Sequence, residues 1–312
     1  MRARTMSAGL GALLVLGLVA ACSSEADGSP APSGGAGDGL TIVASTNVWG
    51  DVAAQVAGDL AHVTSIIDTA AADPHSYEAS ARVQLELARA DLVIVNGGGY
   101  DDFAAQMLGA LDDAPPVIEA VDLLVTDAGT RDDELNEHVW YDLPTVRAVA
   151  DEIASRLATI EPAEAGTFEA NAAAFTDRVA GLEDRAAAIA AVAGGAGVAV
   201  TEPVPLHLVA AAGLTDRTPP EFSESIEEEV DVPPAVMREM LDLVSSSGEV
   251  AFLVYNEQTT GPQTDQVLAA ARDAGVPVVS VTETLPEGED YVSWMASTLD
   301  AFEQALVEQA SR

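Results

Sequence analysis

Short apolar runs rich in β-branched residues alternate with amphipathic stretches through the first half of the chain, from residue 40 onward. Such runs are typical of buried strands, and the stretches between them have the spacing of helices. Strands separated by helices indicate a parallel sheet with both faces covered. The predicted strands are 40–45, 63–67, 92–95 and 115–118, and the predicted helices are 48–57 and 81–90.

The same alternation returns in the second half, which therefore predicts a second α/β unit. The segments repeat the architecture of the first half without repeating its sequence. The predicted strands are 197–201, 250–255 and 276–281, and the predicted helices are 234–244, 264–274 and 291–309.

The most periodic segment of the chain lies between the two halves. Its apolar residues recur every three or four positions, which is the spacing of one buried helix face. The helix is expected to begin near Pro162 and to end before Gly194. At about 1.5 Å per residue it would be on the order of 40 Å long, a stiff connector that limits the relative motion of the halves. The apolar stripe consists of Phe168, Ala172, Phe175, Val179, Leu182, Ala186 and Ile189.

These patterns predict an α/β fold of two lobes, each a mainly parallel sheet flanked by helices, joined by one long α-helix. The expected boundaries are 40–160 for the first lobe, 161–193 for the connecting helix and 194–312 for the second lobe. The composition fits a globular protein, because 48% of the residues are hydrophobic and 21% are charged.

The N-terminus has the features of an export signal. Arg2 and Arg4 precede an apolar stretch at 10–20, which is too short to span a bilayer, where about 20 apolar residues are needed. The small residues before Cys22 look like a bacterial lipobox, so 1–21 is interpreted as a lipoprotein signal peptide and Cys22 as the lipidated residue. A plain secretory signal with an incidental cysteine is the alternative. Both place the protein outside the cytoplasm, and the first anchors it to the bacterial cell membrane.

A tether follows the signal, and the charge of the whole chain restricts the partners. Residues 22–39 are rich in Ser, Gly, Pro and Ala, which is typical of a flexible linker. The chain has 13 Lys and Arg against 51 Asp and Glu, a formal charge of −38. Such a polyanion repels nucleic acid and favours cations as ligands. Cys22 is the only cysteine, which excludes an internal disulfide and multi-thiolate metal sites within one chain.

A histidine site must draw on four residues. His75 lies in a loop after a predicted strand, directly behind Pro74, and His138 lies between a polar loop and a predicted helix. His62 opens a strand, where a surface position is expected. His207 follows Pro205 in a predicted helix, and its role is ambiguous from its spacing.

Two glutamates lie where ligands usually bind in open α/β sheets, beyond the carboxyl ends of strands. Glu202 follows the strand ending at Thr201, and Glu283 follows the strand ending at Thr282. With the two histidines they would converge in the cleft between the lobes. For each glutamate alone, a solvated acid at a strand end is an equally good interpretation.

The motifs of residues 40–312 resemble those of the metal-binding lipoproteins of zinc and manganese ABC transporters, solute-binding proteins with a rigid interlobe helix. Together the motifs are specific, although each is weak alone. They are Asp-Pro-His-Ser-Tyr-Glu at 73–78, Ala-Asp-Leu-Val-Ile-Val-Asn-Gly at 90–97, His-Val-Trp-Tyr-Asp at 138–142 and Tyr-Val-Ser-Trp-Met at 291–295.

The resemblance implies a set of four metal ligands. The two histidine ligands of the family match His75 and His138. The third ligand lies in a motif ending in Gly-Leu, which here points to Glu202 and gives His207 no ligand role. The fourth matches Glu283, where aspartate is the commoner residue of the family. Two neutral imidazoles and two carboxylates would balance the charge of one divalent cation.

The metal is expected to be Mn²⁺ or Zn²⁺. A glutamate as third ligand favours Mn²⁺ through the resemblance, and no His-rich loop precedes His138. The Irving–Williams order nevertheless predicts tighter binding of Zn²⁺ in a test tube. Two groups of acidic residues are expected to be solvated: those within 122–137, and Glu224, Glu227, Glu228, Glu229 and Asp231.

The predicted function is therefore capture of one divalent metal ion and its delivery to the membrane permease of an ABC transporter, by a protein that is a monomer and not an enzyme. No catalytic cofactor is expected. The alternatives are a binder of an organic metal chelate such as a siderophore, haem or cobalamin, a zinc-dependent hydrolase, and a cell-surface adhesin. A hydrolase would need an open metal position, which a fourth protein ligand closes.

Overall fold

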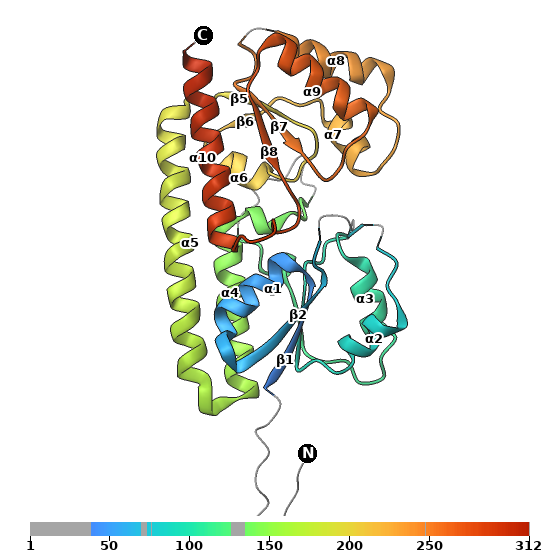
Figure 1. Ribbon diagram of the computed structural model, residues 1–312, viewed down its shortest axis with the longest axis vertical. Helices are drawn as coiled ribbons and strands as arrows, with labels where there is room; N and C mark the ends of the chain where they lie inside the picture. The colour runs from blue at the N-terminus through green and yellow to red at the C-terminus, as the bar shows by residue number, and fades with distance from the viewer. Residues whose placement is uncertain (1–38, 70–73, 76, 126–134, 247, 312) are drawn as a thin grey trace, which may run out of the picture. The chain divides into compact units, whose positions relative to one another are not determined.

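The computed structural model describes residues 39–69, 74–75, 77–125, 135–246 and 248–311, and Figure 1 shows their arrangement. The predicted signal peptide, Cys22 and the tether up to residue 38 lie outside the described residues. The described residues form two four-stranded sheets, in the orders β2-β1-β3-β4 and β6-β5-β7-β8, and all their strand pairs are parallel. The strands are β1 (Leu40–Thr46), β2 (Ala61–Ile67), β3 (Leu92–Val95), β4 (Val117–Glu119), β5 (Gly197–Val200), β6 (Thr215–Asp216), β7 (Phe252–Asn256) and β8 (Val278–Val281).

The helices follow the predicted alternation. Some of the elements are joined by 3-10 turns, at Gly58–Leu60, Ala120–Leu123, Val139–Tyr141 and Pro162–Glu164. The α-helices are α1 (Asn47–Ala57), α2 (Ala81–Leu87), α3 (Asp102–Gly109), α4 (Leu143–Ile160), α5 (Ala165–Ala193), α6 (Leu206–Ala211), α7 (Pro220–Glu227), α8 (Pro234–Ser245), α9 (Pro262–Ala274) and α10 (Tyr291–Ala310).

The central strands are buried on both faces, which explains their continuous apolar runs. Every residue of β3 and of β7 is buried. Parallel strands need helices on both sides of the sheet, so neither face can carry an alternating polar pattern. The largest apolar cluster extends from Ile42 of β1 through Phe175 of α5 to Phe302 of α10. The two sheets therefore belong to one compact unit that begins at Gly39.

The long helix between the sheets is confirmed. The predicted apolar stripe is buried along its whole length, from Phe168 to Ile189. α5 packs against α4 and α10, and Figure 1 shows it running alongside both. It begins one short turn after the predicted start, because Pro162–Glu164 forms a 3-10 turn. It ends at Gly194, whose φ of 59° is a left-handed conformation that glycine adopts without steric cost.

Two elements of the second half were not predicted. β6 is a two-residue edge strand, too short to carry a periodic pattern. α7 is short and polar, but its Phe222 and Ile226 are buried in the apolar cluster that also contains Met240 of α8. The missed helix matters for the site, because it ends at Glu227. Among the described residues, no helix combines the length and apolar character needed to cross a membrane.

Candidate metal centre

The predicted histidines and glutamates line one cavity of about 130 Å³. His75 and His138 come from the first half of the chain, and Glu202 and Glu283 come from the second half. The expectation that ligands bind beyond the carboxyl ends of strands therefore identified two glutamates that line the same cavity as the histidines. The complete lining is His75, His138, Glu202, Glu227, Glu229, Gln258, Thr259, Thr260 and Glu283.

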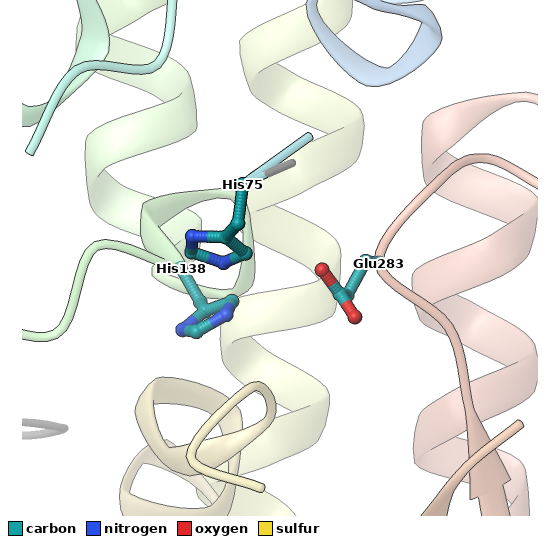
Figure 2. Close-up of side chains that lie close together, drawn as sticks. All are labelled: His75, His138 and Glu283. Carbon is teal, nitrogen blue, oxygen red and sulfur yellow. The ribbon is translucent and has the colours of Figure 1, made fainter. Parts of the chain in front are cut away.

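Three of these side chains are close enough to ligate one ion. His75, His138 and Glu283 each offer one ligand atom, and these atoms lie within 4.8 Å of one another. Figure 2 shows the carboxylate of Glu283 facing the two imidazole rings. His75 is exposed, whereas His138 and Glu283 are buried. The group is thus reached from solvent on the side of His75. Glu202 lines the same cavity but does not belong to this group of three.

The loop before the 3-10 turn Val139–Tyr141 holds His138 through Asn136. The Oδ1 atom of Asn136 accepts from the backbone N–H of His138 at 3.0 Å, which identifies it as the oxygen of the amide. The same oxygen lies 2.8 Å from Nδ1 of His138, so Nδ1 must carry the proton of the neutral ring. Asn136 Nδ2 in turn donates to the carbonyl of Pro203 at 3.0 Å. This chain of contacts leaves the lone pair of the neutral ring on Nε2 of His138, the form in which a histidine can ligate a metal ion.

Burial keeps this imidazole neutral. The pKa of His138 lies well below its usual value, because burial disfavours the charged ring and because His75 and His207 add positive charge nearby when protonated. Aromatic rings surround it, with the centroid of Trp140 at 5.1 Å and that of Tyr100 at 5.8 Å. Tyr100 also makes an edge contact with His75 at 5.0 Å. A neutral imidazole is the form that binds a metal ion.

Asn256, at the end of β7, links the two carboxylates. Its Nδ2 donates to Oε2 of Glu202 at 2.6 Å and to Oε1 of Glu283 at 2.7 Å. The backbone N–H of Asn256 donates to Oγ1 of Thr201, which fixes the strand end next to Glu202. One amide group therefore holds both buried acids at the same edge of the second sheet.

Gln258 positions the loop that carries Glu283. Its Oε1 accepts from the backbone N–H of Glu283 at 2.5 Å and from that of Thr284 at 2.9 Å, and its Nε2 donates to Oγ1 of Thr284. Sequence reasoning missed both Asn256 and Gln258. The signal was available for Asn256, because it follows a buried apolar run at the same sheet edge as Glu202 and Glu283.

The expectation that both acidic groups are solvated is wrong at two positions. The side chain of Glu227 is only 17% exposed, and its Oε1 lies 3.3 Å from Nε2 of His138. Glu137 is half-buried, and burial raises the pKa of its carboxyl group. For Glu227 the cause is the missed helix α7, whose last residue faces the cavity.

The other described residues of these two acidic groups agree with the expectation. Glu224, Glu228 and Asp231 are exposed, and so is Asp122. Glu229 is exposed as well but also lines the cavity. Asp127, Asp132, Asp133 and Glu134 lie outside the described residues.

The two other histidines have structural positions. His62 is exposed on β2, an edge strand, as predicted. His207 is buried in α6 and its Nε2 lies 2.9 Å from the carbonyl oxygen of Asn136. Burial lowers the pKa of His207. His207 does not line the cavity but contacts the residue that orients His138.

Fold and cavity together define a class of protein: a two-sheet binding protein with a nitrogen- and oxygen-lined cleft. The model of the family described as "Zinc-uptake complex component A periplasmic" matches residues 42–305. The chain belongs to this family.

Curated relatives carry names of metal-binding lipoproteins. The manganese-binding lipoprotein MntA of Halalkalibacterium halodurans is 29% identical over 178 residues, which is 55% of this chain and 56% of the relative. The zinc-binding lipoprotein AdcA of Streptococcus pneumoniae is 27% identical over 327 residues, which is 96% of this chain and 60% of the relative. The chain thus spans only somewhat more than half the length of these relatives.

Solved structures share the fold. The binding protein FpvC of Pseudomonas aeruginosa, solved in complex with Mn²⁺, superposes with a TM-score of 0.70 at 23% identity, covering 86% of this chain and 99% of FpvC. The Mn-bound periplasmic metal-binding protein from Candidatus Liberibacter asiaticus gives a TM-score of 0.69 at 20% identity, with the same coverage of both chains. This confirms the predicted architecture of two parallel sheets and a long helix.

Proposed function

We propose that the protein captures one Mn²⁺ or Zn²⁺ ion in the cleft and delivers it to the permease of an ABC transporter. The ligands would be His75, His138, Glu202 and Glu283. The observation that carries the proposal is the group formed by His75, His138 and Glu283, whose ligand atoms lie within 4.8 Å of one another. Glu202 is included because the side-chain amide of Asn256 donates to both Glu202 and Glu283 and so holds the two carboxylates together.

Charge supports a divalent cation as the ligand. Two neutral imidazoles and two carboxylates carry a charge of about −2, which one divalent ion neutralises. Glu202 and Glu283 are 3% and 7% exposed. Burying two like charges beside each other costs free energy unless a cation is shared, so ion binding offsets a penalty that the empty site carries.

The donor set suits both candidate metals. Imidazole nitrogen and carboxylate oxygen ligate Zn²⁺ and Mn²⁺, and the Irving–Williams order favours Zn²⁺ at equal concentration. MntA is named for manganese and AdcA for zinc. We infer that the supply of metal outside the cell, rather than intrinsic affinity, decides which ion is carried.

Delivery requires a location at the membrane. We infer that Cys22 is lipidated and anchors the protein on the outer side of the cytoplasmic membrane. The names of MntA and AdcA as lipoproteins support this assignment. The protein would act as a monomer and would not catalyse a reaction, because four protein ligands leave a tetrahedral ion no open position for water.

Calorimetric titration of the chelator-stripped full-length chain with Zn²⁺ and with Mn²⁺ tests the proposal. We expect one tight equivalent of each metal, with the two competing for the same site. Glu202→Gln should weaken binding of both, because it removes a charge and keeps the shape. Glu249→Gln is the matched control, since Glu249 is exposed and is not part of the cavity lining. Absence of stoichiometric binding would refute the ligand set and favour an organic chelate as the ligand. Unchanged metal binding by Glu202→Gln would refute Glu202 as a ligand.

A further inference from the structure

A second group of possible ligands overlaps the first. His75, Glu137 and Glu227 each offer one ligand atom, and these atoms also lie within 4.8 Å of one another. His75 belongs to both groups. A neutral imidazole has a lone pair on only one of its two nitrogens, so the two groups can be occupied in succession but not together.

The second group lies on the solvent side of the first. His75 is exposed, and Glu137 and Glu227 are half-buried, whereas His138 and Glu283 are buried. An ion entering from solvent therefore meets the group of His75, Glu137 and Glu227 before it reaches the buried ligands. Two carboxylates on this route would also raise the local concentration of cations.

Glu227 connects the two groups. Its Oε1 lies 3.3 Å from Nε2 of His138, the nitrogen that Asn136 leaves as an electron-pair donor. At metal–ligand distances of about 2.0–2.2 Å, adjacent ligands of a tetrahedral ion are about 3.4 Å apart and those of an octahedral ion about 3.0 Å. The two atoms are therefore spaced to ligate one ion jointly.

The backbone after α7 supports this placement. Glu229 has a φ of 54°, the one left-handed non-glycine residue in the described part of the chain. The N–H of Val230 donates to the carbonyl of Ser225 at 2.9 Å, which closes the helix end in the manner usually provided by glycine. A glutamate is less stable than a glycine in this conformation, because its Cβ lies too close to the neighbouring carbonyl oxygen. The turn keeps an acidic side chain at the cavity lining where a glycine would leave none.

We propose that His75, Glu137 and Glu227 form an outer loading position for the same divalent transition metal ion, from which Glu227 passes the ion to His138. The proposal rests on the proposed function, because the outer position leads to the inner site. Glu227 accelerates both entry and release and is not a ligand of the final complex.

Stopped-flow tryptophan fluorescence with Mn²⁺ tests the proposal on the full-length chain, since Trp140 lies close enough to His138 to report the bound ion. Glu227→Gln should lower the association and dissociation rate constants by the same factor, about tenfold, and leave the Kd within about twofold. Glu228→Gln is the matched control, because it removes the same charge one residue away from an exposed position. Its rates should equal those of the wild type.

A second measurement isolates the outer position. In the Glu202→Gln/Glu283→Gln double variant, titration followed by Mn²⁺ electron paramagnetic resonance should show one weak equivalent, which Glu137→Gln or Glu227→Gln then removes. Rates of Glu227→Gln equal to those of Glu228→Gln would overturn the loading role, and so would a higher Kd caused by the dissociation rate alone. If the wild type binds no metal, the proposed function itself fails. If the wild type binds metal tightly but Glu227→Gln has the same rate constants as Glu228→Gln, the loading role fails and the proposed function stands.

Discussion

The two halves of the chain prepare opposite sides of the cleft in different ways. The first half presents the imidazole nitrogens of His75 and His138, and the contact between Asn136 and His138 selects the tautomer that can bind a metal. The second half presents carboxylate oxygens, and Asn256 holds Glu202 and Glu283 side by side. The nitrogen side, formed by His75 and His138, can therefore bind an ion at little electrostatic cost. The oxygen side, formed by Glu202 and Glu283, keeps two acids buried, and a bound cation would offset the free-energy cost of burying their charges.

This difference indicates where the free energy of ion binding arises. A neutral imidazole loses little hydration when the ion arrives, but a pair of buried carboxylates gains a partner for two charges. The nitrogen side should thus determine the geometry of binding, and the oxygen side should determine how much the ion stabilises the fold.

Removing His138 is expected to have the largest effect. His138→Ala deletes the buried imidazole of the proposed site and should lower the affinity for Zn²⁺ and Mn²⁺ by about a thousandfold, or roughly 4 kcal/mol. Calorimetric titration measures this loss. His62→Ala is the control, because His62 is an exposed histidine on an edge strand. If His138→Ala binds like His62→Ala, the nitrogen side does not ligate the ion.

Asn136 offers a milder test of the same side. Asn136→Ala keeps both histidines but removes the acceptor that holds Nδ1 of His138, so Nε2 is no longer oriented. Loss of such an outer contact typically costs about 10- to 100-fold in metal affinity. Asn171→Ala is the control, since Asn171 donates to the carbonyl of Val56 away from the cleft. Equal affinities of the two variants would show that the tautomer is set in another way.

The oxygen side is tested through Asn256. Asn256→Ala removes the donor shared by Glu202 and Glu283, and should lower the free energy of unfolding of the metal-free protein by about 2 kcal/mol. With saturating Zn²⁺ the loss should be smaller, because the ion then attracts both carboxylates. Urea unfolding with and without Zn²⁺ measures the two losses. Equal losses in both states would contradict the assignment of the ion to these acids.

The smallest expected effect is on the pH dependence of stability. Burial lowers the pKa of His207 below its ordinary value near 6.5, so the unfolded chain binds a proton more readily than the native protein. This contribution to stability is complete above about pH 6.5 and is lost as the pH falls towards the lowered pKa, by at most about 1.4 kcal/mol per pH unit.

His207→Gln should therefore flatten the decline in unfolding free energy of the metal-free protein between about pH 7 and pH 5.5. Glutamine keeps a side-chain donor for the carbonyl of Asn136. Urea unfolding at several pH values provides the comparison, and His62→Gln serves as the control. Parallel curves for the wild type and His207→Gln would exclude His207 as a source of the slope.

The fold was largely predictable because its signals are local. Apolar runs identified seven of the eight strands in the described part of the chain, and the stripe from Phe168 to Ile189 identified α5. β6 and α7 escaped prediction because each is short and its burial depends on neighbours far along the chain. The strand-end rule likewise identified Glu202 and Glu283 as cleft residues, since parallel strands end at one edge of a sheet.

The sequence by itself determined the succession of strands and helices and the residue types available for an ion, because periodicity and side-chain chemistry are properties of neighbouring residues. The tertiary structure alone decided which acids reach the cleft. Glu227 and Glu228 are adjacent and identical, yet the end of α7 turns one to His138 and the other to solvent. Packing of Phe222 and Ile226 orients that helix, and packing depends on contacts between segments that the sequence keeps far apart.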